Sequence, residues 1–186
     1  MDVEEAIRSR RTVKAFEREP VDRRTLEELL ELARWAPNHN LTNPWRFRVV
    51  GASALSALKD AATELALAEA PAVADRDKLG EAAAAKLDRA PTLVVLSVKQ
   101  TGDSVQDEED AHAAACAAYI VLLAAHARGL AAYWRTPAVL RSEHGRAAVG
   151  LAPDERFVGL LHLGRARQTA DPPTRAEPGQ YVSFLD

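Results

Sequence analysis

The segment Thr92–Val98, TLVVLSV, decides how the rest of the chain must fold. It is built almost entirely of leucine and β-branched residues, and it lacks the alternation of apolar and polar residues that a half-exposed strand shows. A run of this kind is typical of a strand that is buried on both faces. We therefore predict a central β-strand that follows Pro91 and ends at Lys99.

Three further strands and several helices are predicted outward from this segment. The strands cover 45–50, 130–134 and 156–163, and Gly51 and Gly164 follow the first and the last of them. Capping residues, apolar periodicity and prolines indicate helices over 3–10, from 22 or 25 to 36, 53–70, 75–87, 107–128 and 137–149. Because these elements are intermixed without regular βαβ alternation, we predict an α+β sandwich with a mixed or antiparallel sheet flanked by helices.

The composition limits the classes of protein to which the chain can belong. At 186 residues and 47% hydrophobic content, it fits one domain over 1–186. A net charge of -3 argues against nucleic-acid binding, which requires a basic face. The apolar region 111–130 contains two histidines and is rich in alanine, so we expect a buried helix and no membrane span. The single cysteine, Cys116, and the absence of a signal-peptide pattern favour a cytoplasmic location.

Several common ligand-binding motifs are absent from the sequence. Neither GxGxxG nor GxxxxGK[ST] occurs, which argues against a Rossmann dinucleotide site and a P-loop. The histidines are scattered without metal-ligand spacing, so no metal site is predicted.

The segment Arg8–Lys14, RSRRTVK, brings four cationic side chains and two hydroxyl groups together after the first predicted helix. Arginine matches phosphate oxygens in bidentate fashion, and a threonine hydroxyl can add a further hydrogen bond. The segment alone is explained equally well by an anion site and by a solvated basic surface.

The loop 37–44, PNHNLTNP, is the second candidate for a functional segment. Its prolines and asparagines favour turns and leave side-chain donors and acceptors free. Taken alone, His39 would more commonly cap its own backbone on the surface.

Four segments together carry a resemblance to a known family: AIRSRRTVKAF at 6–16, ARWAPNHNLTNPWRFRVV at 33–50, ARGLAAYWRT at 127–136 and FVGLLHLG at 157–164. In this order they resemble the nitroreductase family of FMN-dependent flavoproteins, and in particular its short, YdjA-like subgroup. The resemblance implies a nitroreductase-like α+β fold. It also implies a domain-swapped homodimer with two FMN sites at the subunit interface.

The resemblance also assigns roles to individual residues. Arg10 and Thr12 match positions that hold the FMN phosphate and ribityl chain, Arg11 is their neighbour, and Lys14 matches a position at the flavin pyrimidine edge. The other matched positions are His39 and Asn43, which reach the flavin of the other subunit, Trp134, Arg135 and Thr136 against the isoalloxazine, Gly164 near the phosphate, and Arg175 as a further phosphate contact.

The activity implied by the resemblance is NAD(P)H oxidation with ping-pong hydride transfer through flavin N5. The acceptors would be nitroaromatics, quinones or activated alkenes, and His39 is the candidate proton donor because histidine titrates near neutral pH. Two alternatives stay open at this point: a non-catalytic FMN carrier or regulator, and a flavin enzyme on the same fold with another acceptor, such as a dehalogenation substrate. The sequence does not identify the physiological acceptor or the choice between NADH and NADPH.

The C-terminal tail, 168–186, is expected to form an arm on the partner subunit. Its first part is rich in proline and charge, whereas YVSFL at 181–185 is apolar and strand-like. This pattern favours an exchange of strands between two subunits. The polar, acidic segment 101–110 is expected to be mobile.

Overall fold

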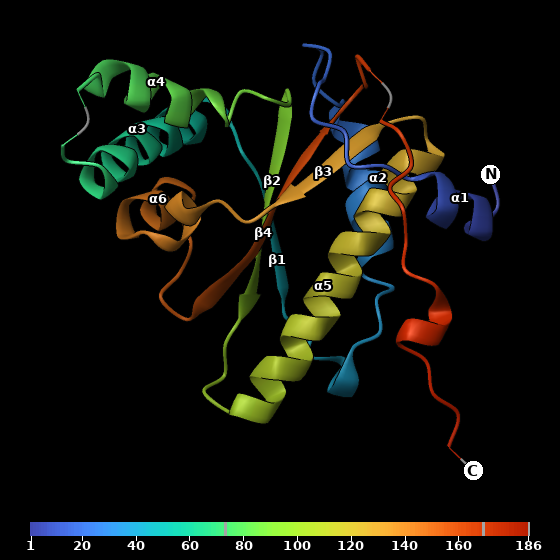
Figure 1. Cartoon of the computed structure of the whole chain (residues 1–186). Helices are drawn as coiled ribbons and strands as arrows, with labels where there is room; N and C mark the ends of the chain where they lie inside the picture. Colours follow the sequence, from blue (N-terminus) through green and yellow to red (C-terminus); the bar gives the residue numbers. More distant parts are fainter. Residues whose placement is uncertain (73, 169, 186) are drawn as a thin grey trace.

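The computed structural model describes residues 1–72, 74–168 and 170–185. Residues 169 and 186 of the predicted C-terminal arm lie outside the described residues. The described chain forms a central sheet with helices on both faces (Figure 1).

The sheet has four strands in the order β1-β2-β4-β3, and every neighbouring pair is antiparallel. The strands are β1 Trp45–Val49, β2 Thr92–Lys99, β3 Ala131–Arg135 and β4 Glu155–Gly164. The prediction of a central strand is confirmed, because Thr92–Val98 is buried throughout and lies between β1 and β4. The predicted α+β class is also confirmed. Of the two predicted kinds of sheet, mixed or antiparallel, the structure has the antiparallel one.

Helices α2 Arg23–Ala33 and α5 Ser104–Ala127 cover one face of the sheet (Figure 1). Helix α2 begins after Asp22, whose carboxylate accepts the Thr25 N–H at 2.9 Å. Helix α5 is long and apolar enough by composition to span a membrane. Its inner side, however, packs on the sheet and on α2, as expected of a core helix. The buried residues of this layer include Leu29, Val94, Leu96, Ala114, Ala118, Val121 and Leu161.

The opposite face is covered by α3 Ala52–Glu69, α4 Arg76–Ala85, η2 Ala138–Arg141 and α6 Glu143–Ala148 (Figure 1). Apolar side chains of α3 and η2 meet the other side of β2 and β4, whereas α4 packs on α3. This second core contains Leu58, Leu93, Val95, Leu140, Phe157 and Leu160. The sheet is therefore buried on both faces, which explains the continuous apolar run in β2.

The prediction of one continuous helix over 137–149 was wrong. The chain is extended at Ser142, which separates η2 from α6, and the Ser142 Oγ accepts the Gly145 N–H at 3.2 Å. Gly145 also packs so closely on the Val139 carbonyl that a Cβ would lie 1.8 Å from its oxygen. A serine that caps the following turn competes with helix continuation, and this explains the break.

Helix α5 begins at Ser104, three residues earlier than predicted. Asp103 accepts the N–H groups of Val105 and Gln106. Asp107 binds the Thr101 and Gly102 N–H groups at 2.6 and 3.2 Å, which lowers the pKa of its carboxyl group. The segment 101–110 is therefore a hydrogen-bonded cap and the start of a helix, and the expectation of a mobile loop was wrong.

The N-terminal part of the chain runs along the free edge of the sheet. Helix α1, Val3–Ser9, is capped by Asp2, and the chain then passes beside β3, where the Val13 N–H donates to the Ala132 carbonyl at 3.2 Å. Further on, the Arg167 N–H donates to the Ala15 carbonyl at 2.9 Å. The segment 10–17 is thus held between β3 and the chain that leaves β4.

The C-terminal tail leaves the body of the molecule, and its end lies far from the sheet (Figure 1). Among the described residues of the tail, only Pro178–Gln180 form a regular element, the 3-10 turn η3. Residues 181–185, which the sequence predicted as a strand, have no strand pairing in the single chain, and Phe184 is 92% exposed. A strand requires a neighbouring edge for its hydrogen bonds, and the described chain offers none to this segment.

Candidate functional site

The residues Arg8–Lys14, called here the basic segment, pack against the C-terminal half of α5. The Arg10 guanidinium carbon lies 6.0 Å from the centre of the Tyr119 ring. The Arg10 Nε is buried, and among the described residues no acceptor binds it. Beside it, the Ser9 Oγ and the His126 Nε2 are 2.7 Å apart. This end of α5 therefore holds a positive charge whose buried donor has capacity for an additional acceptor.

Arg11 has a different arrangement from Arg10. Its Nη1 donates to the carbonyl oxygens of Arg8 and Arg10 at 2.6 and 2.9 Å, so its guanidinium is bound to the local backbone. Burial lowers the pKa of His126, and the charges of Arg10 and Arg11 lower it further. A neutral His126 leaves the positive charge of this region to the arginines.

Lys14 and Thr12 lie against strand β3. Thr12 forms a parallel bridge with Ala132, and the Lys14 Nζ lies 5.9 Å from the centre of the Tyr133 ring. Both Thr12 and Lys14 are exposed. The structure thus brings the basic segment to the strand that carries the predicted Trp134, Arg135 and Thr136.

The side chains at the end of β3 diverge. The Trp134 indole belongs to the α2–α5 side, where its Nε1 donates to the Val158 carbonyl at 3.4 Å. Arg135 lies on the other side and donates to the Lys86 carbonyl at 3.0 Å, and burial lowers the pKa of its guanidinium. Thr136 is exposed. The indole therefore packs against the core on this side of the sheet. The backbone of Trp134 is the part of the residue that can line a site at the strand end.

Gly164 and Arg175 differ in how firmly the fold places them. Gly164 is buried at the end of β4, and a Cβ there would lie 3.0 Å from Pro91 and 3.2 Å from Phe16. Glycine thus suits this position, because Pro91 and Phe16 both approach it closely. Arg175 lies in the exposed tail, and in the described ranges no hydrogen bond or ion pair connects it to the other predicted site residues.

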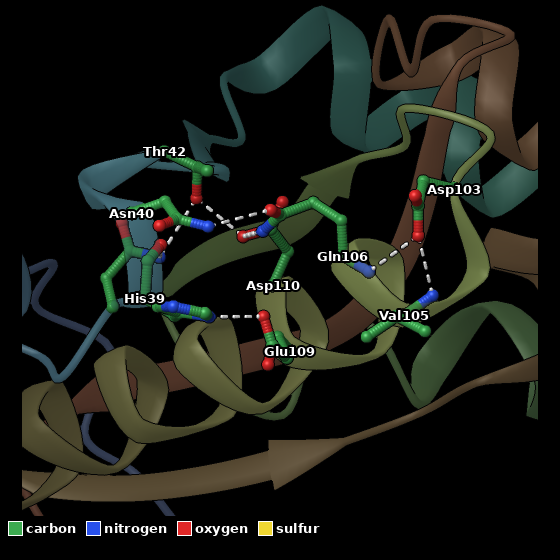
Figure 2. A network of polar contacts seen from close by, with 9 residues as sticks. His39, Asn40, Thr42, Asp103, Val105, Gln106, Glu109 and Asp110 are labelled. Atoms are coloured by element: carbon green, nitrogen blue, oxygen red, sulfur yellow. Dashed lines mark hydrogen bonds and ion pairs between the residues drawn. The ribbon is translucent and has the colours of Figure 1, made fainter.

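The loop with His39 is anchored to the other end of α5 (Figure 2). The His39 Nδ1 and the Glu109 Oε2 are 2.7 Å apart, and Thr42 Oγ1 donates to the Asp110 carboxylate at 2.5 Å. The Asp110 side chain is buried and also accepts from Gln106 at 3.1 Å. These bonds fix the loop, including the short turn η1 His39–Leu41, to the first turns of α5.

The same loop contains strained backbone. Asn40, Leu41 and Asn43 have positive φ angles of 57°, 51° and 47°, a region that is unfavourable for residues other than glycine. The Asn43 Nδ2 donates to the Leu41 carbonyl at 2.7 Å, so the asparagine side chain supports the loop itself. Leu41 is 79% exposed. The strain holds an apolar side chain outward, next to His39.

The predicted site residues therefore form two groups at opposite ends of α5. Arg10 and Ser9 contact Tyr119 and His126, whereas His39 contacts Glu109. At 1.5 Å per residue, His126 and Glu109 are about 25 Å apart along the helix axis. Within one chain, the structure does not bring His39 and Asn43 to Arg10, Thr12 and Lys14.

Sequence reasoning missed the α5 residues that position both groups, namely Tyr119, His126 and Glu109. The sequence feature that could have identified this surface is the helical spacing of His112, Cys116, Tyr119 and His126, which puts these residues on one face of the helix.

A cavity of about 400 Å³ adjoins the first group and is lined by Ser9, Arg11, Val13, His126 and Pro172. Within residues 1–72, 74–168 and 170–185, no three His, Cys, Asp or Glu side chains cluster as metal ligands.

Comparison with known proteins adds to this geometry. The sequence profile of the Nitroreductase family matches residues 7–165. The chain is 26% identical over 190 residues to YdjA of Escherichia coli (strain K12), provisionally named an NAD(P)H nitroreductase, and the match covers all of both chains.

Two solved structures have a similar fold. The nitroreductase-like family protein from Bacillus cereus has a TM-score of 0.86 at 24% identity, covering 100% of this chain and 97% of that one. The FMN-dependent nitroreductase NfnB from Mycobacterium smegmatis, solved in complex with NADPH, has a TM-score of 0.76 at 22% identity, covering 98% and 97%. At these identities the two structures establish the fold.

Proposed function

This chain belongs to the nitroreductase family, and from that premise we propose that it is a homodimeric FMN-dependent oxidoreductase that takes electrons from NADH or NADPH. The observation that supports this proposal most strongly is the pairing of the basic segment with β3: Thr12 pairs with Ala132 and Lys14 lies over Tyr133, on the strand that ends at Trp134 and Arg135. YdjA and NfnB, which carry nitroreductase names, support the same activity.

The residues of the first group fit the FMN phosphate and ring in their charge and donor chemistry. Arg10 has a buried donor without a partner among the described residues, and Thr12 is exposed beside it. Arg10 and Thr12 would hold the phosphate with charge-assisted hydrogen bonds. Lys14 would contact the pyrimidine edge, where a cation stabilises negative charge, and Arg11 would keep Arg10 in position through its bonds to the backbone. Gly164 and Arg175 are proposed as further neighbours of the phosphate.

The strand end Trp134–Thr136 would border the ring system. FMN, when bound, would supply the chemistry, namely hydride transfer from a nicotinamide to a nitroaromatic, quinone or activated-alkene acceptor. The chain's contribution is to bind and orient. The indole of Trp134 fixes the strand from the side of the core, which leaves its backbone N–H to face the ring.

The second group would be supplied by another subunit. The His39 loop contacts α5 at Glu109. Arg10 and Ser9 contact it at Tyr119 and His126, about 15 and 25 Å farther along the helix axis. The two groups can therefore meet only if a second chain places its loop beside Arg10 of the first. If two α5 helices pack against each other across a two-fold axis at their midpoints, each chain places its His39 loop beside the basic segment of the other. The outward face of α5 carries Val105, His112, Cys116 and Tyr119, which are exposed in the single chain.

His39 is the proposed proton donor to the acceptor. Glu109 lies 2.7 Å from its Nδ1, an arrangement that orients the ring and leaves Nε2 toward the outside of the loop. Leu41, held outward by the strained turn, would provide apolar contact for the acceptor in the same place. We propose a cytoplasmic location.

Arg10→Ala tests the cofactor site. The loss of one or two charge-assisted hydrogen bonds should weaken FMN binding by about 2–3 kcal/mol, measured by flavin fluorescence during titration of the apoprotein. Arg24→Ala is the matched control, because Arg24 is exposed on α2 and bonds only to Glu28 among the described residues. Equal FMN affinity of the Arg10 variant and the wild type would refute the assignment.

Turnover is tested separately from binding. The FMN-loaded protein should oxidise NADH or NADPH in the presence of nitrofurazone or menadione, and its flavin absorbance should bleach when the reductant is added without acceptor. A protein that binds FMN but stays yellow with both nucleotides would be a carrier or regulator. A protein that bleaches but reduces neither acceptor would point to a different acceptor on the same fold.

A further inference from the structure

A second polar cavity lies at the end of the sheet remote from Arg10. Its volume is about 490 Å³, and it is lined by Gln100, Arg141, Arg146, Glu155, Arg156 and Phe157, with Pro153 at its edge. These residues surround the start of β4, whereas the basic segment pairs near the end of that strand. At about 3.3 Å per residue, the two places are about 30 Å apart along β4. Within one chain, the cavity is therefore remote from the basic segment.

The only carboxylate that lines this cavity is already neutralised. Glu155 is 9% exposed, and its two carboxylate oxygens accept from Arg48 Nη1 and Nη2 at 2.8 and 2.7 Å. The Ser97 Oγ donates to the same carboxylate at 2.6 Å. Burial raises the pKa of Glu155, but the bonds from Arg48 and Ser97 outweigh it, and the net result is a lowered pKa. Glu155 thus stays ionised and paired with Arg48, which lies outside the cavity lining.

Three arginines remain to give the cavity its charge. Arg146 is held in place because its Nη2 donates to the carbonyl oxygens of Ala152 and Glu155 at 2.7 and 3.0 Å. Arg141, at the end of η2, and Arg156, on β4, are exposed, and in the described ranges no ion pair involves them. The nearby Asp107 carboxylate accepts hydrogen bonds from the Thr101 and Gly102 N–H groups. These bonds lower its pKa, and the charge of Arg156 adds a smaller effect in the same direction.

Gln100 adds a donor to the same wall. Its backbone N–H donates to the Asp154 carbonyl at 2.7 Å, which fixes the residue. Its side-chain Nε2 is buried, and among the described residues no acceptor binds it. A cavity lined by three arginines and one glutamine, in a chain whose net charge is -3, is suited to an anion with several oxygens.

We propose that this cavity, named here the Arg141–Arg156 site, binds a phosphate dianion. The phosphate is either the free ion or the phosphate group of a small ester. Arg141 and Arg156 make the charge-assisted contacts from opposite sides, and Arg146 holds the base of the cavity. None of its lining residues belongs to the basic segment or to β3, so the site shares no residue with the proposed flavin contacts of these segments.

The test is calorimetric titration of the protein, as purified with its cofactor, with inorganic phosphate at constant ionic strength. The wild type should bind phosphate saturably. Arg141→Gln and Arg156→Gln should each raise the Kd at least about tenfold, the loss expected for one charge-assisted contact. Arg23→Gln is the matched control, because Arg23 is an equally exposed arginine on α2 that pairs with Glu27, and it should leave the Kd unchanged. Absence of saturable binding by the wild type, or equal Kd values in all four proteins, would overturn the proposal.

A second variant separates this site from the proposed flavin site. In Arg10→Ala protein, phosphate binding at the Arg141–Arg156 site should persist, even if that variant contains no FMN. Phosphate binding that disappears with Arg10→Ala and survives Arg141→Gln would show that the ion occupies the N-terminal basic segment, and would refute this proposal while leaving the flavin assignment intact. Titration with adenosine 2′-phosphate then identifies the source: tighter binding than inorganic phosphate assigns a nucleotide ester, and equal binding assigns the free ion.

Discussion

The Trp134 indole lies directly over Gly159, with one residue on β3 and the other on β4. A Cβ on Gly159 would be 2.1 Å from the indole Nε1 and 2.7 Å from Cδ1. The indole also donates to the neighbouring Val158 carbonyl at 3.4 Å. Only glycine permits this contact, and through it the core of the molecule holds the end of β3, from which Arg135 and Thr136 project.

Gly159→Ala should therefore displace the Trp134 side chain. An added methyl group in a packed sheet layer costs about 1–3 kcal/mol, so we expect a lower urea midpoint together with a shift in tryptophan emission. Gly179→Ala, at a position with open space around the Cβ, should leave both unchanged. An alanine variant with unaltered emission would mean that the indole does not occupy this place.

The Arg48–Glu155 pair predicts a second stability effect. Glu155→Gln removes one charge and leaves the Arg48 guanidinium, whose side chain is 28% exposed, without its counter-ion. Loss of one partner of a buried pair costs about 3 kcal/mol, to be measured by urea unfolding at pH 7. Since the pKa of Glu155 is lowered in the folded chain, its contribution is present above the unfolded pKa and is lost as the pH falls through the folded pKa.

The double variant Arg48→Met/Glu155→Met is the control for this pair. With neither charge left unpaired, it should be more stable than Glu155→Gln. The single variants Arg48→Met and Glu155→Met complete the comparison. If the stability lost by the double variant equals the sum of the losses in these two, the side chains contribute independently and the pair is not coupled.

His162 predicts an acid-sensitive core. The side chain is fully buried on β4, and its ring centre lies 5.3 Å from that of Tyr133 at an interplanar angle of 37°. No described residue hydrogen-bonds either ring nitrogen. Burial, with smaller effects of Arg135 and Arg89, lowers the pKa of His162 to about 3. Below about pH 6.5 the unfolded histidine binds a proton and the folded one does not, so stability falls by up to about 1.4 kcal/mol per pH unit.

His162→Leu should remove that slope between pH 6 and pH 4, as followed by unfolding free energies across this range. His144 supplies a control of opposite sign. Its pKa is raised by the hydrogen bond and charge of Glu64, 2.6 Å away, so its contribution is present below the unfolded pKa and is lost as the pH rises. His144→Gln should thus lower the stability at acid pH and leave the slope between pH 6 and pH 4 unchanged. An unchanged slope in His162→Leu would show that another group governs the acid transition.

Much of the fold could be predicted because local patterns and packing agree. The run Thr92–Val98 is apolar on both sides because helices cover both faces of β2, and Asp2 and Asp22 mark helix starts by bonds within their own turns. Prediction failed where a distant contact decides the outcome. Ser142 interrupts a helical pattern as Gly145 packs on Val139, and the strand-like segment 181–185 has no neighbouring edge in the described chain.

The candidate site shows the same division. The motif identified Arg10, Lys14 and His39, but sequence spacing could not say that Arg10 meets Tyr119 and His39 meets Glu109 at the two ends of one helix. Those contacts join residues about 70 or more positions apart in the chain, as with Glu109 and His39. The resemblance implied a site shared by two chains, and the tertiary structure adds that the two groups of residues lie apart along α5 within one chain.

The proposed dimer makes a specific prediction for Cys116. Arg10 and Ser9 contact α5 near residues 119–126, and the His39 loop contacts it near residues 106–110. A two-fold axis that superposes these ends passes through the middle of α5, close to Cys116, which is exposed. Packed helices lie about 8–10 Å apart, so a short bis-maleimide should join the two cysteines and give a band at twice the 20.2 kDa chain mass.

The position of the axis can be checked by moving the cysteine along α5. Cys116→Ser should abolish the joined species, and Ser104→Cys in that background should not restore it, because residue 104 begins the helix and the two copies of that residue lie far from each other in an antiparallel pair. Efficient joining through residue 104, or a purely monomeric Cys116 protein that still binds FMN at full occupancy, would contradict a site shared between two chains. Under the proposed arrangement only the central cysteine reacts, since only the middle of α5 meets itself across the axis.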